Sequence, residues 1–125
     1  MEDCIEVRMP GRNPWIEGPV VKVSHIQATQ IAEVAAGVAE SFRGKFDSAW
    51  MYDKPVFDAV VDMLPEDTYE REAMFRAVQI VLSKNIDYSD WYGGKYAAYR
   101  CFETRNAYAT PGFIEAKRYS EMQGT

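Results

Sequence analysis

The chain contains few residues of the types that catalyse reactions, and they do not form a recognisable catalytic group. His25 is the single histidine, and Cys4 and Cys101 are the two cysteines. A catalytic histidine needs a nucleophile and an orienting acid nearby, and a zinc site needs several histidines or cysteines at short spacing. The sequence shows neither pattern. We therefore predict no metal and no cofactor, and we lean toward a protein that is not an enzyme.

Paired carboxylates are the other group that could perform acid–base chemistry. Asp58 and Asp62 are four residues apart on an expected helix, but they lie off its apolar face. Asp87 and Asp90 flank Tyr88 in a segment with the character of a turn, where aspartate commonly bonds to the backbone. We interpret the first pair as part of a solvated helix face and the second pair as turn formers.

The most distinctive stretch is Tyr88–Phe102, YSDWYGGKYAAYRCF, which holds six of the seventeen aromatic residues around a glycine pair. Tyrosine and tryptophan are enriched at contact surfaces, because they combine a large apolar area with a polar tip. Two successive glycines let the backbone take a positive φ or let another chain approach closely. We therefore predict that Trp91 and Tyr92 anchor a partner. The predicted partner-binding site consists of Trp91, Tyr92, Gly93, Gly94, Lys95 and Arg100.

A structural interpretation of the same stretch stays open. Tyr96, Tyr99 and Phe102 have helical spacing, and apolar side chains at such spacing usually belong to a core. In that case Gly93-Gly94 is simply a turn.

Two functional alternatives also stay open. A small-molecule pocket or an active site could form near Tyr92, Arg100 and His25, with Cys101 as a further candidate. Alternatively, the protein is a subunit of a homo-oligomer whose aromatic residues are buried in its own interface.

Residues 90–111, DWYGGKYAAYRCFETRNAYATP, resemble the glycine-pair aromatic stretch of the ArdB/KlcA anti-restriction family. In that family a Y-x-G-G-Y-W-x-F-Y segment is followed by an aromatic residue and M-A-P. The resemblance covers about a sixth of the chain. It departs from the family pattern where Lys95 replaces an aromatic residue and Ala97-Ala98 replace bulkier ones. The stretch also follows three expected helices here, whereas in that family it precedes the main helices, so we assign no family from it.

Composition limits the class of protein and of partner. A chain of 125 residues with 47% hydrophobic content fits one globular domain, residues 1–125, and argues against disorder. The net charge of −5 disfavours a nucleic-acid binder, which needs clustered lysine and arginine. The N-terminus lacks a signal-peptide pattern, and no apolar run approaches the roughly 20 residues that span a bilayer. We expect a cytoplasmic protein with free, partly buried cysteines.

Local patterns predict the elements that must position these residues. Residues 4–9 alternate between apolar and charged, which predicts a strand, and Val20–Val23 predicts a second one. The two can pair as a hairpin around a long loop that carries Trp15. Helices are expected from Ser24 to about Arg43, over roughly 54–63 and about 67–84, over 95–103 in preference to a strand, and from Thr110-Pro111 onward.

Within these helices, Ser24 with Gln27 and Asp67 with Glu70 have the spacing of capping pairs. Gly37 is expected to mark close helix packing. The expected buried stripes are Ile31, Val34, Ala35, Val38 and Phe42 in the first helix, and Phe57, Val60, Val61 and Leu64 in the second.

We thus expect an α+β fold that is mainly α, with an N-terminal β-hairpin packed on four to five short helices. The missing catalytic group, the acidic balance and the aromatics at Trp15, Trp50, Trp91 and Tyr92 together favour a small acidic protein-binding module. An inhibitor or an anti-defence protein of a mobile element is one form of such a module. The expected partner is another protein, in preference to nucleic acid or a membrane.

Overall fold

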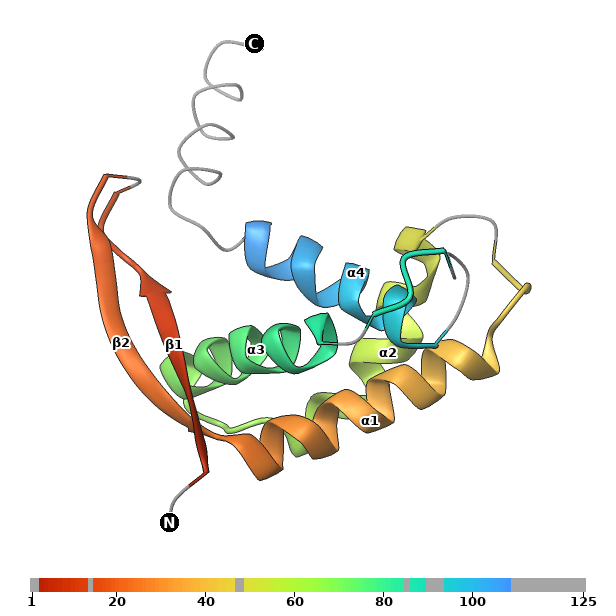
Figure 1. Cartoon of the computed structure of the whole chain (residues 1–125), viewed down its shortest axis with the longest axis horizontal. Coiled ribbons are helices and arrows are strands. Elements are labelled where there is room, and N and C mark those ends of the chain that lie inside the picture. Colours follow the sequence, from red (N-terminus) through yellow and green to blue (C-terminus); the bar gives the residue numbers. More distant parts are fainter. Residues whose placement is uncertain (1–2, 14, 47–48, 85, 90–93, 109–125) are drawn as a thin grey trace, which may run out of the picture.

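The computed structural model describes residues 3–13, 15–46, 49–84, 86–89 and 94–108. It confirms a mainly helical α+β fold, in which an antiparallel two-stranded hairpin precedes the helices (Figure 1). The expected helix from Thr110-Pro111 lies outside the described residues. In chain order the elements are β1 (Cys4–Pro10), β2 (Glu17–Ser24), α1 (His25–Ser41), the 3-10 helix η1 (Ala49–Tyr52), α2 (Asp53–Val60), the 3-10 helix η2 (Val61–Met63), α3 (Thr68–Ser83) and α4 (Gly94–Tyr108).

The hairpin buries one face against the helices, as the alternation in β1 predicts. Ile5, Val7 and Met9 are buried, whereas Cys4 and the charged residues between them are exposed. The strands are antiparallel, with Ile5 opposite Val23 and Val7 opposite Val21, so apolar side chains of both strands join the core.

β2 is longer than the expected Val20–Val23 strand, because it begins at Glu17. Pro10 pairs with Glu17 beyond a break in the register, so the ladder continues across a bulge. Gly18 and Pro19 occupy the bulge, and in the sequence these residue types indicate a turn. The hairpin is therefore longer, and its loop shorter, than the pattern indicates.

The N-terminus of α1 is capped, but only by half of the expected capping box. The Ser24 hydroxyl accepts a hydrogen bond from the backbone N–H of Gln27 at 3.2 Å. The Gln27 side-chain amide does not return to Ser24. It donates to the Met63 carbonyl at 3.4 Å, and so it ties α1 to η2.

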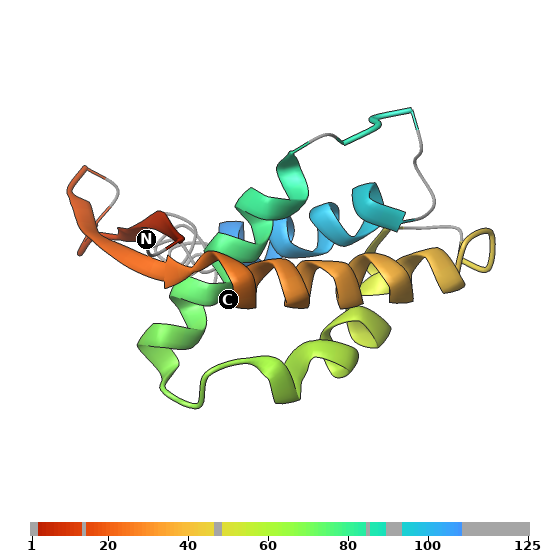
Figure 2. The ribbon, with the colours of Figure 1, turned by 60° about the horizontal axis from the view of Figure 1, so that its bottom comes forward.

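The buried face of α1 is made mainly of alanines, and α1 contacts all three other α-helices across it (Figure 2). The expectation that Val34 is buried is wrong, since its side chain is 36% exposed. The expectation for Gly37 is wrong as well, because a Cβ built there has no neighbour within 4 Å. Small side chains let neighbouring helices approach closely, so packing selected the alanine face. The buried residues of α1 are Ala28, Ile31, Ala32, Ala35 and Ala39.

The expected second helix is divided, because α2 ends at Val60 and η2 continues it as a 3-10 turn. Val56 and Leu64 are buried, and Phe57 is half-buried against the core. The expectation that Val61 is buried is wrong. A 3-10 turn has three residues per turn, so side chains after Val60 point in other directions than an α-helix would give.

α3 and α4 complete the helical body. The Asp67 carboxylate caps α3 by accepting from the Glu70 backbone N–H at 2.9 Å, as predicted. Residues 95–103 are helical, which confirms the preferred reading. α4 lies along α1 in the opposite direction (Figures 1 and 2). Its buried side chains are Ala97, Ala98, Cys101 and Phe102, together with Asn106.

Three phenylalanines join α2, α3 and α4. The ring centres of Phe57 and Phe102 are 5.2 Å apart, and those of Phe75 and Phe102 are 5.6 Å apart. Phe57 meets Phe102 nearly edge to face, which is a favoured geometry for aromatic pairs. The ring centres of Phe57 and Phe75 are 5.9 Å apart, so each ring contacts both others, and Phe102 is fully buried among them.

Candidate functional site

The hairpin lies at one end of the helical body, and its loop extends beyond the helices (Figures 1 and 2). Two glycines let the strands approach closely near the loop. A Cβ on Gly11 would lie 1.8 Å from the Ile16 carbonyl oxygen, and one on Gly18 would lie 2.1 Å from the Met9 carbonyl oxygen. Both contacts are with backbone atoms, so neither position accepts a side chain unless the chain shifts.

The loop between the strands is held by its own hydrogen bonds. The Asn13 side-chain oxygen accepts from the Trp15 N–H at 3.0 Å, and the Asn13 carbonyl accepts from the Ile16 N–H at 3.2 Å. An asparagine that bonds to the backbone two residues later is a common turn former. The Arg8 guanidinium donates to the Gly18 carbonyl at 2.9 Å across the hairpin. The loop conformation therefore does not require a partner.

This loop and the adjoining strand expose apolar side chains. Trp15 is 85% exposed, Ile16 52% and Val20 46%. We call Trp15, Ile16 and Val20 the hairpin tip. Tryptophan is prominent among the residues that dominate binding energy at interfaces. Since Asn13 already bonds to the backbone of Trp15 and Ile16, burying Trp15 in a partner would cost little backbone entropy.

Three of the six residues in the site predicted from the sequence, Trp91, Tyr92 and Gly93, lie outside the described residues, as does the side chain of Trp50. The expected positive φ of the glycine pair is confirmed at Gly94, whose φ is +58°. Gly94 begins α4 beside the end of α1, where an added Cβ would lie 2.9 Å from a carboxylate oxygen of Glu40.

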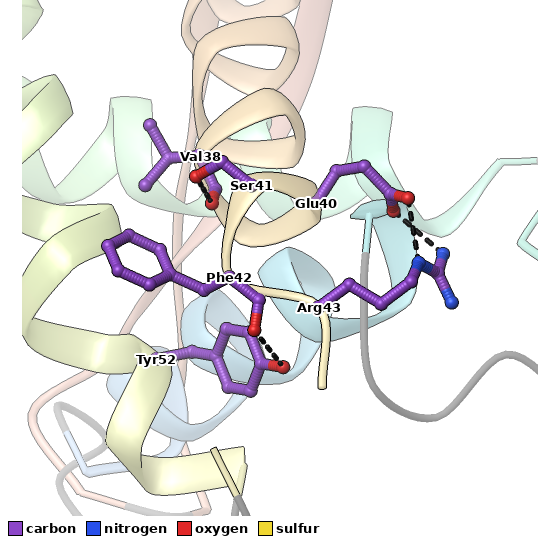
Figure 3. Close-up of polar contacts among 6 residues, drawn as sticks. All are labelled: Val38, Glu40, Ser41, Phe42, Arg43 and Tyr52. Atoms are coloured by element: carbon purple, nitrogen blue, oxygen red, sulfur yellow. Dashed lines mark hydrogen bonds and ion pairs between the residues drawn. The ribbon is translucent and has the colours of Figure 1, made fainter. Parts of the chain in front are cut away.

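The end of α1 beside Gly94 is held by polar contacts (Figure 3). The Arg43 guanidinium donates two hydrogen bonds of 2.7 Å to the Glu40 carboxylate. The Tyr52 hydroxyl donates to the Phe42 carbonyl at 3.3 Å. The Phe42 carbonyl follows the last residue of α1, and it also accepts from the Lys45 backbone N–H at 2.9 Å. Together these contacts fix the surface on which α4 begins.

Lys95 and Arg100 both make contacts within the chain. The Lys95 ammonium donates to the Lys84 carbonyl, just after α3. Arg100 donates to the Tyr96 hydroxyl at 3.3 Å and lies 5.9 Å from the centre of that ring. Tyr88, which is exposed, meets Tyr96 edge to face at 5.7 Å. Tyr88, which is not among the six predicted residues, is therefore an exposed aromatic side chain next to the described part of the site.

The structure does not bring together the described residues of the alternative pocket. His25 is the first residue of α1, and its Nδ1 lies 3.1 Å from the Asp3 carboxylate. α4 begins beside Glu40, about 22 Å away along α1 at about 1.5 Å per residue. Arg100 lies less than two turns into α4, about 9 Å back toward His25, which leaves more than about 10 Å between them.

Cys101 is in an unfavourable environment for a nucleophile. Its side chain is buried, and the burial together with a hydrogen bond to Asp53 raises the pKa of the thiol well above its ordinary value. The thiolate is the reactive form, so the fold suppresses reaction at this position. The expectation of free cysteines is confirmed, but Cys4 is exposed, contrary to the expected partial burial.

The two thiols should react with N-ethylmaleimide at very different rates. At about pH 8, near the ordinary pKa of a thiol, we expect Cys4 to be modified at least about a hundredfold faster than Cys101. Mass spectrometry of peptides from timed samples measures both rates, and denaturant should make the rates equal. Rapid modification of Cys101 in the folded protein would contradict the expectation and restore it as a candidate nucleophile.

Comparisons of the chain with protein-family models, curated proteins and solved structures find no match. The resemblance of residues 90–111 therefore depends on that stretch alone. The described residues contain no group of three or more His, Cys, Asp or Glu that could hold a metal ion. Within the same ranges, no helix combines the length and the apolar character needed to cross a bilayer. The geometry of the hairpin tip is thus the main guide to function.

Sequence reasoning identified Trp15 as an exposed aromatic but missed Ile16 and Val20. Val20 is opposite Arg8, which belongs to the outward, charged face of β1. The alternation of β1 therefore predicts that Val20 is exposed, but only once the pairing of Val20 with Arg8 is known.

Proposed function

We propose that this protein acts by binding another protein, with the hairpin tip as the anchor. The observation that carries the proposal is the 85% exposure of Trp15 on a loop that Asn13 already holds in place. An indole offers about 150–250 Å² of contact area. At roughly 25 cal/mol per Å², its burial supplies roughly 4–6 kcal/mol before the costs of association.

The charges of the hairpin support a protein partner over a polyanion. Its described residues 3–13 and 15–24 carry equal numbers of acids and bases, so they offer no basic stripe to a phosphate backbone. The exposed Arg12 and Glu17 flank the tip with opposite signs. We expect the partner to present an apolar pocket for the indole, with a rim of mixed charge.

The hairpin backbone supplies a second means of contact. Within the described residues, β1 and β2 pair only with each other, so each strand keeps an outer edge. Strand edges can accept an extended segment of a partner through main-chain hydrogen bonds. Insertion of Trp15 would then give affinity, and strand addition would fix the orientation.

An inhibitor or an anti-defence protein of a mobile element is one form of this proposed function. A small acidic chain that acts through a projecting loop suits such a role, since inhibition needs only a stable contact. We place the protein in the cytoplasm, in keeping with its two free cysteines.

Site-specific photo-crosslinking in the source cells tests the proposal. Benzoylphenylalanine is placed at position 15 in one variant and at position 69 in another. Tyr69 serves as the matched control, because it is also an exposed aromatic but lies at the start of α3. We expect one protein to be crosslinked from position 15 and not from position 69. A crosslink to a second copy of the chain would favour the homo-oligomer instead.

The captured protein is then purified, and its affinity is measured by calorimetry. We expect Trp15→Ala to weaken binding at least about tenfold, or about 1.4 kcal/mol, while Tyr69→Ala stays within about twofold. The Trp91→Ala/Tyr92→Ala variant tests the site predicted from the sequence. If Trp15→Ala binds with wild-type affinity and the double variant loses affinity, the anchor is that second site and not the hairpin tip.

A further inference from the structure

A cavity of about 350 Å³ lies where β1, α3 and α4 meet. Its size falls at the lower end of the range for small-molecule sites. The lining contains two guanidinium groups, an amide and two hydroxyls, and no acid among its described residues. The lining residues are Val7 and Arg8 from β1, Arg76, Gln79, Ile80 and Ser83 from α3, and Tyr99 from α4.

Arg76 is the unusual member of this lining. Its Nε and Nη2 atoms are buried and have no hydrogen-bond partner among the described residues. Burial lowers the pKa of its guanidinium, and the nearby Glu72 charge opposes this change. The residue as a whole is half-buried, but its two buried nitrogens without an acceptor are costly, because they have lost water without gaining a replacement. An anion in the cavity would supply that replacement.

The acid next to Arg76 is hydrogen-bonded to a different arginine. The Glu72 carboxylate accepts from Arg105 of α4 at 2.5 Å, and both side chains are partly exposed. The Arg105 guanidinium also lies 4.7 Å from the centre of the Phe75 ring. The Glu72 carboxylate therefore lies near two guanidinium groups, those of Arg76 and Arg105, so the charge of Arg76 is not fully balanced.

The other polar side chains of the cavity already make contacts within the chain. Arg8 Nη1 donates to the Gly18 carbonyl at 2.9 Å and lies 3.8 Å from the Glu17 carboxylate, but a guanidinium has five N–H groups, so others remain for a ligand. The Gln79 side-chain oxygen accepts from the Asn106 amide at 2.6 Å. That bond fixes the Gln79 amide, which also bonds to the Tyr99 side chain, and the Tyr99 hydroxyl donates to the Glu103 carboxylate at 2.8 Å.

We propose that the cavity binds a small molecule through an oxyanion, a carboxylate or a phosphate group, with Arg76 as the main donor and Arg8 at the rim. Guanidinium groups pair with both kinds of oxyanion through parallel hydrogen bonds. Val7 and Ile80 provide an apolar wall for the rest of the ligand. The site uses none of the hairpin-tip side chains, so it does not depend on the proposed partner-binding function.

Nuclear magnetic resonance titration of the isotope-labelled protein tests this site. Inorganic phosphate and succinate are added separately, with sodium chloride at matched ionic strength as the reference. The Arg76 Nε–H resonance is followed. We expect at least one probe to shift it saturably, while chloride does not. Saturation by phosphate alone would indicate a phosphate ligand, and saturation by succinate alone a carboxylate ligand.

Three variants then separate a specific site from a general charge effect. We expect Arg76→Gln to weaken binding of the effective probe at least about tenfold, and Arg8→Gln at least about threefold. Arg43→Gln removes the same charge at the end of α1 and should change the affinity less than about twofold. The Arg8 side chain is more than half exposed, so that variant tests the site even if Arg76→Gln fails to fold. Equal losses in all variants that fold, or no saturation by about 50 mM of either probe, would overturn the proposal.

Discussion

Replacing Phe102 with alanine should lower the free energy of unfolding by about 3–5 kcal/mol, the usual cost of removing a buried phenylalanine side chain. Phe102 is fully buried, with its ring centre 5.2 Å from that of Phe57 and 5.6 Å from that of Phe75. The change removes the ring through which α4 meets α2 and α3. Domains of this size are stable by only about 5–15 kcal/mol, so the variant should be close to unfolding.

Denaturant unfolding followed by circular dichroism measures this loss. Tyr69→Ala is the matched control, since Tyr69 is an aromatic residue on α3 with about half of its surface exposed. We expect that variant to change stability by less than about 0.5 kcal/mol. A loss below about 1 kcal/mol for Phe102→Ala would show that the three-ring cluster is not the centre of the core.

Gly11→Ala should disrupt the hairpin loop while the helices stay folded. The new Cβ would lie 1.8 Å from the Ile16 carbonyl oxygen, which is a backbone atom with no freedom to rotate away. Relief requires a shift of the chain at Ile16, next to Trp15. We expect a stability loss of about 2–3 kcal/mol, within the range for steric overpacking, and at least about tenfold weaker binding of the crosslinked partner.

Gly37→Ala is the matched control for this variant. A Cβ on Gly37 has no neighbour within 4 Å, and the residue lies on an exposed face of α1. Alanine there should raise stability by up to about 1 kcal/mol, because it favours the helix and restricts the unfolded chain. Hydrogen exchange of residues 11–20 reports the loop directly. Unchanged exchange in Gly11→Ala would mean that the two strands have more room than the structure shows.

Several features of the fold were determined by the sequence alone, because they depend on residues a few positions apart. The alternation around Val7 predicts β1, the Ser24 and Asp67 side chains predict the starts of α1 and α3, and helix formers predict α4 after Gly94. Each of these signals is satisfied within one or two turns of chain. The glycine pair permits a positive φ or a close approach of another chain, and Gly94 takes the positive φ.

Tertiary structure decided which faces of the helices are buried. The sequence favours Val34 as a core residue, yet alanines outside the expected stripe, such as Ala32 and Ala39, are buried, because α1 must lie close to three other helices. Gln27 bonds to Met63 and not to its own cap, since η2 offers an acceptor that is distant in the sequence. Hydrophobicity alone cannot decide these outcomes, because they depend on which elements meet.

The candidate sites also depend partly on local sequence and partly on tertiary structure. Composition marked Trp15 as a loop aromatic, but its exposure follows from the path of the hairpin away from the helices. Lys95 and Arg100 were predicted as partner contacts, whereas the fold gives each of them a partner within the chain. The cavity beside Arg76 had no signal in the sequence, because β1, α3 and α4 are far apart along the chain and enclose it only when packed together.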